Sequence, residues 1–370
     1  MQFIDLATQQ ERIKADLDRR IQAVLAHGSY VMGPEIGELE HRLAEYVGAK
    51  HAVACASGTD ALLMALMASG IGAGDAVITS PFTFIATAEV VALLGARPVF
   101  VDIDPQTFNL DPEKLTDCIS SWPAEGLRLR AIIPVDLFGL PADYDRINAI
   151  AKQHGLMVIE DAAQSFGGQY KGRMAGALAD MACTSFFPAK PLGAYGDGGM
   201  CFTDDDETDE RLRSIRVHGQ GSDRYDNIRI GINGRLDTLQ AAVLLSKFSI
   251  FLEEIEQRQI VARRYTSLLS TSGVKTPAVP EGYRSAWAQY SLLAESEAHR
   301  SELQVKLKAE GIPTAIYYPK PLHLQTAFAY LGYREGDYPV SEDFAIRVFS
   351  LPMHPYLTPE SQERIAATFE

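Results

Sequence analysis

A lysine with an unusual local sequence stands near the middle of the chain. Lys190 lies between Pro188 and Pro191 and is followed by a glycine-rich stretch. Because a proline disfavours the helical conformation in the residue before it, we expect Lys190 on an extended turn. The predicted strands 181–187 and 198–203 flank this turn. An amine at such a strand edge could form a Schiff base with a carbonyl compound, and the alternative is an exposed loop lysine without chemistry.

A second candidate site follows the predicted strand 51–56, where Ser57-Gly-Thr-Asp60 leads into the apolar helix 61–68. The first N–H groups of a helix have no partner within it, and the helix dipole adds positive potential there, so this turn could bind an anion. Gly58 would let the backbone approach the anion and Thr59 would add a hydroxyl donor. An ordinary helix cap is the alternative, since serine, threonine and aspartate are preferred capping residues.

An acidic residue ends the apolar stretch 157–160. Asp161 would be partly buried, so its carboxylate would need a cationic partner, although a helix cap is again the alternative. Glu160 should point to the opposite side, because successive side chains of a strand alternate between faces.

These residues belong to a region in which strands and helices alternate. Such alternation is typical of an α/β fold with a mostly parallel sheet, helices on both faces and ligands at the carboxyl ends of the strands. Each candidate residue follows the end of a predicted strand, so we expect all of them near one rim. They are Gly58, Thr59, Phe84, Asp161, Gln164, Ser185 and Lys190.

The length of 370 residues suits one large domain and one smaller domain. A long helical pattern from about 238 to 269 would join them. We expect a large cofactor-binding domain over residues 1–250, with an N-terminal helical arm, and a small α+β domain over 251–370. The elements predicted in the small domain are strands near 286–293 and 313–318 and helices 301–310, 342–348 and from 359 onward.

The formal net charge of −14 argues against nucleic acid or an anionic membrane as the partner, because phosphate groups need a basic surface. No export signal or membrane-spanning stretch is visible, so we expect a cytoplasmic protein. The four cysteines show no metal-ligand spacing, which favours reduced thiols and no metal site.

The candidates together provide an anion cradle, an aromatic ring, a buried acid and a lysine. Pyridoxal phosphate needs this set: a lysine for its Schiff base, an acid that keeps the ring nitrogen protonated, and a helix N-terminus for the phosphate. The sequence therefore predicts pyridoxal 5'-phosphate as the cofactor.

Several short strings spread over nearly the whole chain form a recognisable set. They are Ala56-Ser-Gly-Thr-Asp-Ala-Leu62, Ile159-Glu-Asp-Ala-Ala-Gln164, Ser185-Phe-Phe-Pro-Ala-Lys190, Tyr195-Gly-Asp-Gly-Gly199, Asn233-Gly-Arg235 and Tyr318-Pro319, with the opening Phe3-Ile-Asp-Leu6 and the closing Ser350-Leu-Pro-Met-His354. With these strings the chain resembles the DegT/StrS family of nucleotide-sugar aminotransferases. The resemblance implies the aspartate-aminotransferase type of fold (fold type I) and a homodimer with shared active sites.

The resemblance also implies roles for individual residues. Lys190 would form the Schiff base and move protons, and Asp161 would pair with the pyridinium nitrogen. The remaining cofactor contacts that it implies are Gly58, Thr59 and Ser185 at the phosphate, Asn233 from the partner subunit, Phe84 stacked on the ring and Gln164 at the 3-hydroxyl oxygen.

The implied reaction moves an amino group from L-glutamate to a nucleotide-linked keto sugar. Several stretches look closest to relatives that aminate a 3-keto N-acetylated uronic acid on UDP for surface polysaccharides, including lipopolysaccharide. An acidic sugar needs a fixed cation, which Arg235 could supply, with Tyr318 as a hydroxyl partner. Tyr317 joins this substrate set, although many relatives have histidine there. A structural ion pair at the dimer surface is the alternative for Arg235.

Other functions remain as alternatives. A 4-keto-6-deoxy nucleotide sugar is the alternative acceptor. A sugar dehydratase of the same fold is opposed by Lys190, because some dehydrating relatives carry histidine at that position. A regulator that binds the cofactor without catalysis is opposed by the intact set of site residues. A dinucleotide-binding dehydrogenase, suggested by Gly70-Ile-Gly-Ala-Gly74, fails because this string follows a predicted helix and precedes a strand.

Overall fold

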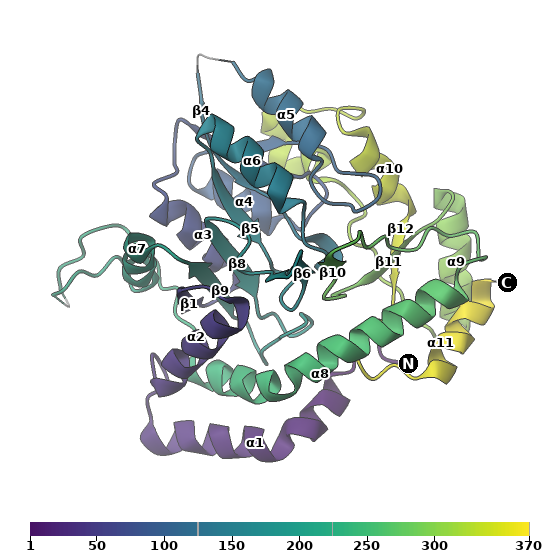
Figure 1. The fold of residues 1–370 in the computed structure, drawn as a ribbon, viewed down its shortest axis with the longest axis horizontal. Helices are drawn as coiled ribbons and strands as arrows, with labels where there is room; N and C mark the ends of the chain where they lie inside the picture. The colour runs from purple at the N-terminus through teal and green to yellow at the C-terminus, as the bar shows by residue number, and fades with distance from the viewer. Residues whose placement is uncertain (124–125, 224, 370) are drawn as a thin grey trace.

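A seven-stranded sheet lies at the centre of the computed structural model, which describes residues 1–123, 126–223 and 225–369 (Figure 1). The strand order is β1-β9-β8-β5-β4-β2-β3. Strand β9 is antiparallel to β1 and β8, and the other pairs are parallel, which confirms the predicted mostly parallel sheet. The strands are β1 (His51–Cys55), β2 (Asp75–Thr79), β3 (Arg97–Phe100), β4 (Arg128–Ile133), β5 (Met157–Asp161), β8 (Met181–Ser185) and β9 (Gly199–Thr203).

Helices cover both faces of this sheet, so the strands β2 and β9 are buried along their whole length. Strands that are covered on both faces need apolar side chains on both faces, so their sequences do not alternate between apolar and polar residues. One face packs against α3 (Gly58–Ala68), α4 (Ala86–Leu93) and α7 (Asp206–Arg216). The other packs against α2 (Pro34–Val47), α5 (Pro112–Ser120), α6 (Tyr144–His154) and α8 (Thr238–Leu268).

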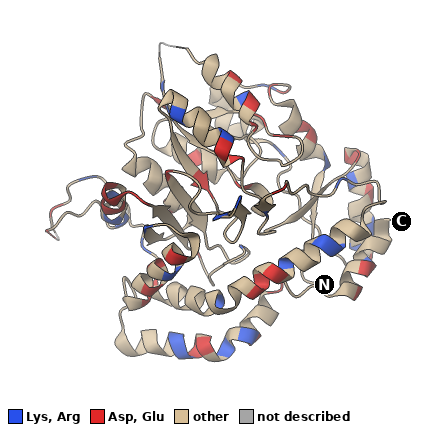
Figure 2. Cartoon of the chain, in the orientation of Figure 1, with Lys and Arg blue, Asp and Glu red and all other residues tan. Residues whose placement is uncertain are grey.

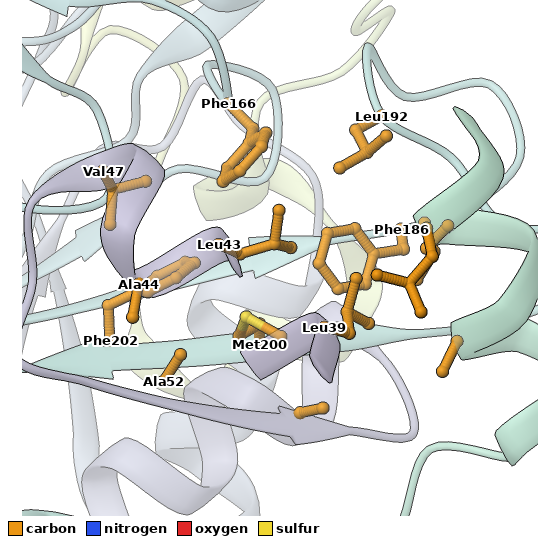
Figure 3. Close-up of a cluster of buried hydrophobic side chains, with 14 of the residues drawn as sticks. Leu39, Leu43, Ala44, Val47, Ala52, Phe166, Phe186, Leu192, Met200 and Phe202 are labelled. Atoms are coloured by element: carbon orange, nitrogen blue, oxygen red, sulfur yellow. The ribbon is translucent and has the colours of Figure 1, made fainter. Parts of the chain in front are cut away.

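The core between α2, α8 and the sheet fixes the segment that leads to Lys190. Leu39 and Leu43 of α2 pack against Phe186 and Met200 in this cluster (Figure 3). Full burial of each such side chain contributes about 1.5–3 kcal/mol. Phe186 directly follows β8 and is 0% exposed, so packing anchors the chain a few residues before Lys190.

The N-terminal helix α1 (Leu6–His27) lies along α8 (Figure 1). Its buried residues include Ile13, Leu17 and Val24, whereas charged residues recur along the helix (Figure 2) and most of them are exposed. The helix is capped by the Asp5 side chain, and it ends at Gly28 in the left-handed conformation. The N-terminus is therefore helical, and in this structure the helix packs against α8.

The C-terminal part contains a two-stranded antiparallel sheet of β11 (Tyr290–Leu293) and β12 (Val348–Leu351). The prediction of a strand over 313–318 was wrong, because only Ala315 pairs there, in a single bridge to Ser350. The partner of β11 is instead the buried segment Val348–Leu351, of which only the first residue belongs to the predicted helix 342–348. The helices of this part are α9 (Glu297–Ala309), α10 (Pro339–Arg347) and α11 (Pro359–Ala366).

A further small sheet was not predicted from the sequence. It pairs β6 (Gln169–Tyr170) with β7 (Arg173–Met174) and with β10 (Tyr283–Arg284). The proposed domain boundary at residue 250 falls inside α8, which contributes to the cores on both sides of it.

Three of the cysteines meet inside the sheet although they are far apart in sequence. Cys55, Cys183 and Cys201 lie on the neighbouring strands β1, β8 and β9, and all are free and buried. Burial raises the pKa of the Cys55 and Cys183 thiols, which keeps them protonated and unreactive.

The described residues were compared with two features that the sequence analysis considered, a membrane-spanning helix and a metal site. Within the ranges 1–123, 126–223 and 225–369, no helix has the length and apolar character needed to cross a membrane. The same residues contain no group of three or more histidine, cysteine or acidic side chains that could hold a metal ion.

Candidate active site

The carboxyl ends of five strands meet at one edge of the central sheet. Because β9 is antiparallel to both β1 and β8, those two strands point the same way, and β5, β4 and β2 follow in parallel. Gly199, the first residue of β9, pairs with both Cys55 and Ser185. The sequence analysis predicts the candidate residues at this edge, where the strands end.

Lys190 lies on a tight turn after β8. Its backbone N–H donates to the carbonyl oxygen of Phe187 at 2.8 Å, which confirms the turn predicted from the flanking prolines. The side chain is half-buried. Burial of the amine lowers the Lys190 pKa to about 8, and the nearby Asp161 carboxylate opposes this shift. A lysine amine with a pKa near 8 is a far better nucleophile at neutral pH than an exposed lysine.

Asp161 lies at the end of β5 and is 4% exposed. The Thr87 hydroxyl donates to its Oδ2 at 2.8 Å, and the Ala163 N–H donates to Oδ1 at 3.2 Å. Burial raises the pKa of this carboxyl, and these hydrogen bonds and Lys190 act against the rise. Its environment therefore favours a cation beside it. The neighbouring Glu160 accepts from other backbone groups, on the opposite side as predicted.

The predicted anion cradle lies at the start of α3. The Ser57 hydroxyl caps the helix by accepting from the Asp60 N–H at 3.0 Å, so the capping alternative is realised by Ser57. The N–H groups of Gly58 and Thr59 then stand at the helix start, where no helical carbonyl precedes them. A Cβ on Gly58 would lie 2.6 Å from the Ser185 Cβ. Only glycine lets the end of β8 come this close to the helix, and the resulting cradle suits a phosphate.

We therefore expect Gly58→Ala to weaken pyridoxal phosphate binding about tenfold, because the added methyl group must displace Ser185. The dissociation constant can be measured by absorbance titration. Gly37→Ala is the matched control, since a Cβ on this α2 glycine meets nothing within 4 Å. Equal affinity of the Gly58 variant and the native protein would exclude the cradle.

Gln164 presents a hydrogen-bond donor toward the rim. Its Oε1 accepts from the Phe138 N–H at 2.8 Å, which leaves Nε2 facing the Tyr318 hydroxyl at 3.4 Å. The Tyr318 ring lies 6.3 Å from the ring of Phe84, and Phe84 is 54% exposed. Tyr317 packs edge-on against Tyr318 at 5.9 Å. These contacts connect the predicted substrate tyrosines to the predicted cofactor residues.

Asn233 and Arg235 lie next to the cradle rather than beside Lys190, because the carbonyl oxygen of Gly234 between them accepts from the Ala56 N–H at 3.0 Å. Asn233 is exposed, and its side-chain oxygen accepts from Arg235 Nε at 2.8 Å. Arg235 lines a hollow of about 480 Å³. The other residues lining this hollow are Ala56, Ser57, Asp60, Gly196, Asp197, Leu236, Asp237 and Gln240.

The sequence analysis missed Thr87, whose hydroxyl donates a hydrogen bond to Asp161. The signal for it was a polar residue on the buried face of the apolar helix α4. It also missed Phe138, because the irregular segment after β4 has no periodicity that would reveal its contact with Gln164.

A parallel-sheet rim that combines a lysine of lowered pKa, a buried aspartate and a helix-start cradle fits pyridoxal phosphate. The chain belongs to the DegT/DnrJ/EryC1/StrS aminotransferase family, whose model matches residues 11–370. It is a pyridoxal-phosphate-dependent aminotransferase, as the sequence predicted.

Three relatives are similar to this chain over most of their own length. The chain is 53% identical to the UDP-2-acetamido-2-deoxy-3-oxo-D-glucuronate aminotransferase of Pseudomonas aeruginosa, over 99% of each chain. A crystal structure of a family aminotransferase from Brucella abortus has 53% identity and a TM-score of 0.95, covering 100% of this chain and 98% of that one. The Bacillus subtilis protein NtdA, solved with bound pyridoxamine phosphate, has 29% identity and a TM-score of 0.88, covering 99% and 82%. These structures confirm the predicted fold.

Proposed function

We propose that the protein transfers an amino group from L-glutamate to the 3-keto group of a UDP-linked N-acetylated uronic acid, for surface polysaccharide synthesis. The observation that carries the proposal is the 53% identity to the P. aeruginosa enzyme over 99% of both chains, in a chain whose Lys190 amine is close enough to Asp161 for the carboxylate to act on its pKa. Sugar amination by the family makes a 4-keto-6-deoxy nucleotide sugar the second candidate acceptor.

Two residues of the chain would carry out the proton chemistry. When bound, pyridoxal phosphate supplies a ring that withdraws electrons from the carbon bearing the amino group. The Lys190 amine would hold the cofactor, take the proton from the donor's α-carbon and return one in the second half of the reaction. Asp161 would keep the ring nitrogen protonated, because a buried carboxylate is stabilised by an adjacent positive charge.

The remaining residues would bind and orient the cofactor. Gly58, Thr59 and Ser185 would donate to the phosphate from the start of α3 and the end of β8. Phe84 would stack on the ring with its exposed face, and Gln164 would donate through Nε2 to the ring's 3-oxygen.

The lowered pKa of Lys190 predicts how cofactor capture depends on pH. Only the neutral amine attacks an aldehyde, and the neutral fraction grows as pH rises through the pKa of about 8. The association rate of pyridoxal phosphate should therefore increase up to about pH 8 and then level off. Stopped-flow absorbance on either side of this pH tests it. A rate that keeps climbing toward the pKa of an ordinary lysine would contradict the buried amine.

We infer that the working unit is a homodimer with shared active sites. The Asn233 side chain is exposed, and its oxygen accepts from Arg235 rather than from a residue of the group around Lys190. Tyr30 and Ile230 are exposed large apolar side chains, as a surface that meets a second copy would have.

Complementation tests the shared sites. Each of Lys190→Ala and Asn233→Ala should be inactive or weak alone. A mixed dimer would contain one site with both native residues, so activity should return after the two variants are unfolded and refolded together. No recovery in verified mixed dimers would show that Asn233 does not act across an interface.

The substrate class is tested with UDP-linked 3-keto sugars that differ only at the carboxylate. The native enzyme should prefer the uronic acid about tenfold or more in kcat/KM, because Arg235 supplies a fixed cation. Arg235→Gln should lose this preference while it keeps the activity on the neutral sugar. A preference that survives the substitution would assign Arg235 to a structural ion pair. Turnover of 4-keto-6-deoxy sugars alone would establish the second candidate.

A further inference from the structure

The turn that carries Asp161 and Gln164 is clamped by the segment directly after β4. The Asp136 N–H donates to the Asp161 carbonyl oxygen at 3.1 Å. The Phe138 N–H donates to Gln164 Oε1 at 2.8 Å. The Ser165 hydroxyl donates to Asp136 Oδ2 at 2.7 Å. A short segment that no proposed role involves therefore holds the turn on both sides of Gln164.

Asp136 is the centre of this clamp. Its side chain is fully buried, and its Oδ1 accepts from the Ala142 N–H and the Tyr144 hydroxyl, both at 2.9 Å. Ser165 occupies the other oxygen, so donors from α6, from the preceding loop and from the turn fix the carboxylate. Such a fixed group can determine where the turn lies.

The clamp is costly for the protein to build. Burial raises the pKa of Asp136, and it also raises the pKa of the neighbouring Glu160 carboxyl. Phe138 adopts a φ of 60°, in the left-handed region that residues with a side chain rarely occupy. Strained backbone and buried carboxyl groups of raised pKa concentrate at functional sites.

We propose that Asp136 is a positioning residue that acts through Ser165 to hold the turn 161–165, so that Asp161 and Gln164 face the bound cofactor together. The proposal rests on the roles given to Asp161 and Gln164 above. Asp136 does not touch the cofactor, and its effect is exerted through the geometry of the turn.

Two hydroxyl groups donate to this carboxylate, and only one of them belongs to the turn. Ser165→Ala removes the bond to the turn, whereas Tyr144→Phe removes the bond from α6 and leaves the turn attached. Both variants lose one buried hydrogen bond to the same acceptor, so they are matched for stability. Asp136→Asn keeps an acceptor for Ala142 and Tyr144 and offers an amide N–H to the Ser165 oxygen, so it should preserve the clamp in part.

The dissociation constant of pyridoxal phosphate and the visible circular-dichroism band of the loaded protein are measured for all three variants. Ser165→Ala should weaken binding about tenfold and reduce the band, because the loss of a hydrogen bond to a charged group is large enough for this change. Tyr144→Phe should stay within about twofold, and Asp136→Asn should weaken binding less than Ser165→Ala. Thermal unfolding should show similar losses for Ser165→Ala and Tyr144→Phe.

Equal effects of Ser165→Ala and Tyr144→Phe on binding and on the band would overturn the proposal, since the clamp would then serve stability alone. If Ser165→Ala does not fold, Ser165→Cys retains a weak donor, and binding as tight as in the native protein would equally overturn it. Native turnover with L-glutamate in both Lys190→Ala and Asp161→Asn would instead refute the roles proposed for the site, whatever the clamp variants do.

Discussion

Lys190→Ala is expected to lower the rate of amino transfer about 10³-fold or more, because one amine both holds the cofactor and moves the proton. Burial lowers its pKa to about 8. Roughly a tenth to a fifth of the amine is then neutral near physiological pH, against about one part in a thousand for an ordinary lysine. The cradle at the start of α3 does not depend on this amine, so the variant should still bind pyridoxal phosphate. The measurement is single-turnover absorbance after L-glutamate is added to the loaded protein.

Lys247 provides a matched control for this substitution. It is 1% exposed, burial lowers its pKa to about 8 as well, and its Nζ lies 4.3 Å above the ring of Tyr195. Lys247→Met should therefore retain turnover, although the unfolding temperature can change. If Lys247→Met abolished turnover and Lys190→Ala did not, the assignment of the reactive lysine would be reversed.

Asp161→Asn is expected to reduce turnover about 10²–10³-fold, the size of effect seen when a preorganised electrostatic partner is removed from an active site. The amide has nearly the same shape and can still accept from the Ala163 N–H, so the loss reports the charge. A second expected sign is a weaker response of the cofactor's visible band to L-glutamate. The loss of turnover is measured by steady-state kinetics, with kcat and KM determined separately.

The control for Asp161 is a buried aspartate at the amino end of a strand, away from the carboxyl ends where the site lies. Asp75 begins β2, is 1% exposed and pairs with Arg128 at 2.9 Å. Asp75→Asn should lower stability and leave kcat near the native value, because its charge lies at the amino end of the strand. Similar losses of kcat in both variants would show that Asp161 acts through stability.

The rim of the site could be predicted because its signals are local in sequence. Prolines around Lys190 specify a turn, and Ser57 with Gly58 marks a helix start after an apolar strand. The parallel sheet then brings successive strand ends together without further information. In the structure Gly58 lies against Ser185, and Asp161 is near enough to Lys190 to act on the pKa of its amine.

What could not be predicted depends on pairing between distant segments. The sequence predicts a strand over 313–318 and a helix that ends at Val348, whereas β11 pairs with the segment Val348–Leu351. The contact of Asp136 with Ser165 joins an irregular segment to a turn, and neither has a periodicity that reveals it. The meeting of three thiols on β1, β8 and β9 could not be predicted either, because it depends on which distant strands pair.

The continuous helix α8 makes the chain indivisible. Leu245 and Phe251 belong to the core beside the central sheet, whereas Val261 and Tyr265 belong to the C-terminal core. Arg258 lies between them and donates to the carbonyl oxygen of Trp287 at 2.9 Å. A protein cut at residue 250 would expose apolar surface on both fragments, so neither half could be exchanged with a relative as a module. Recombination within the family would have to transfer α8 together with both of the cores it enters.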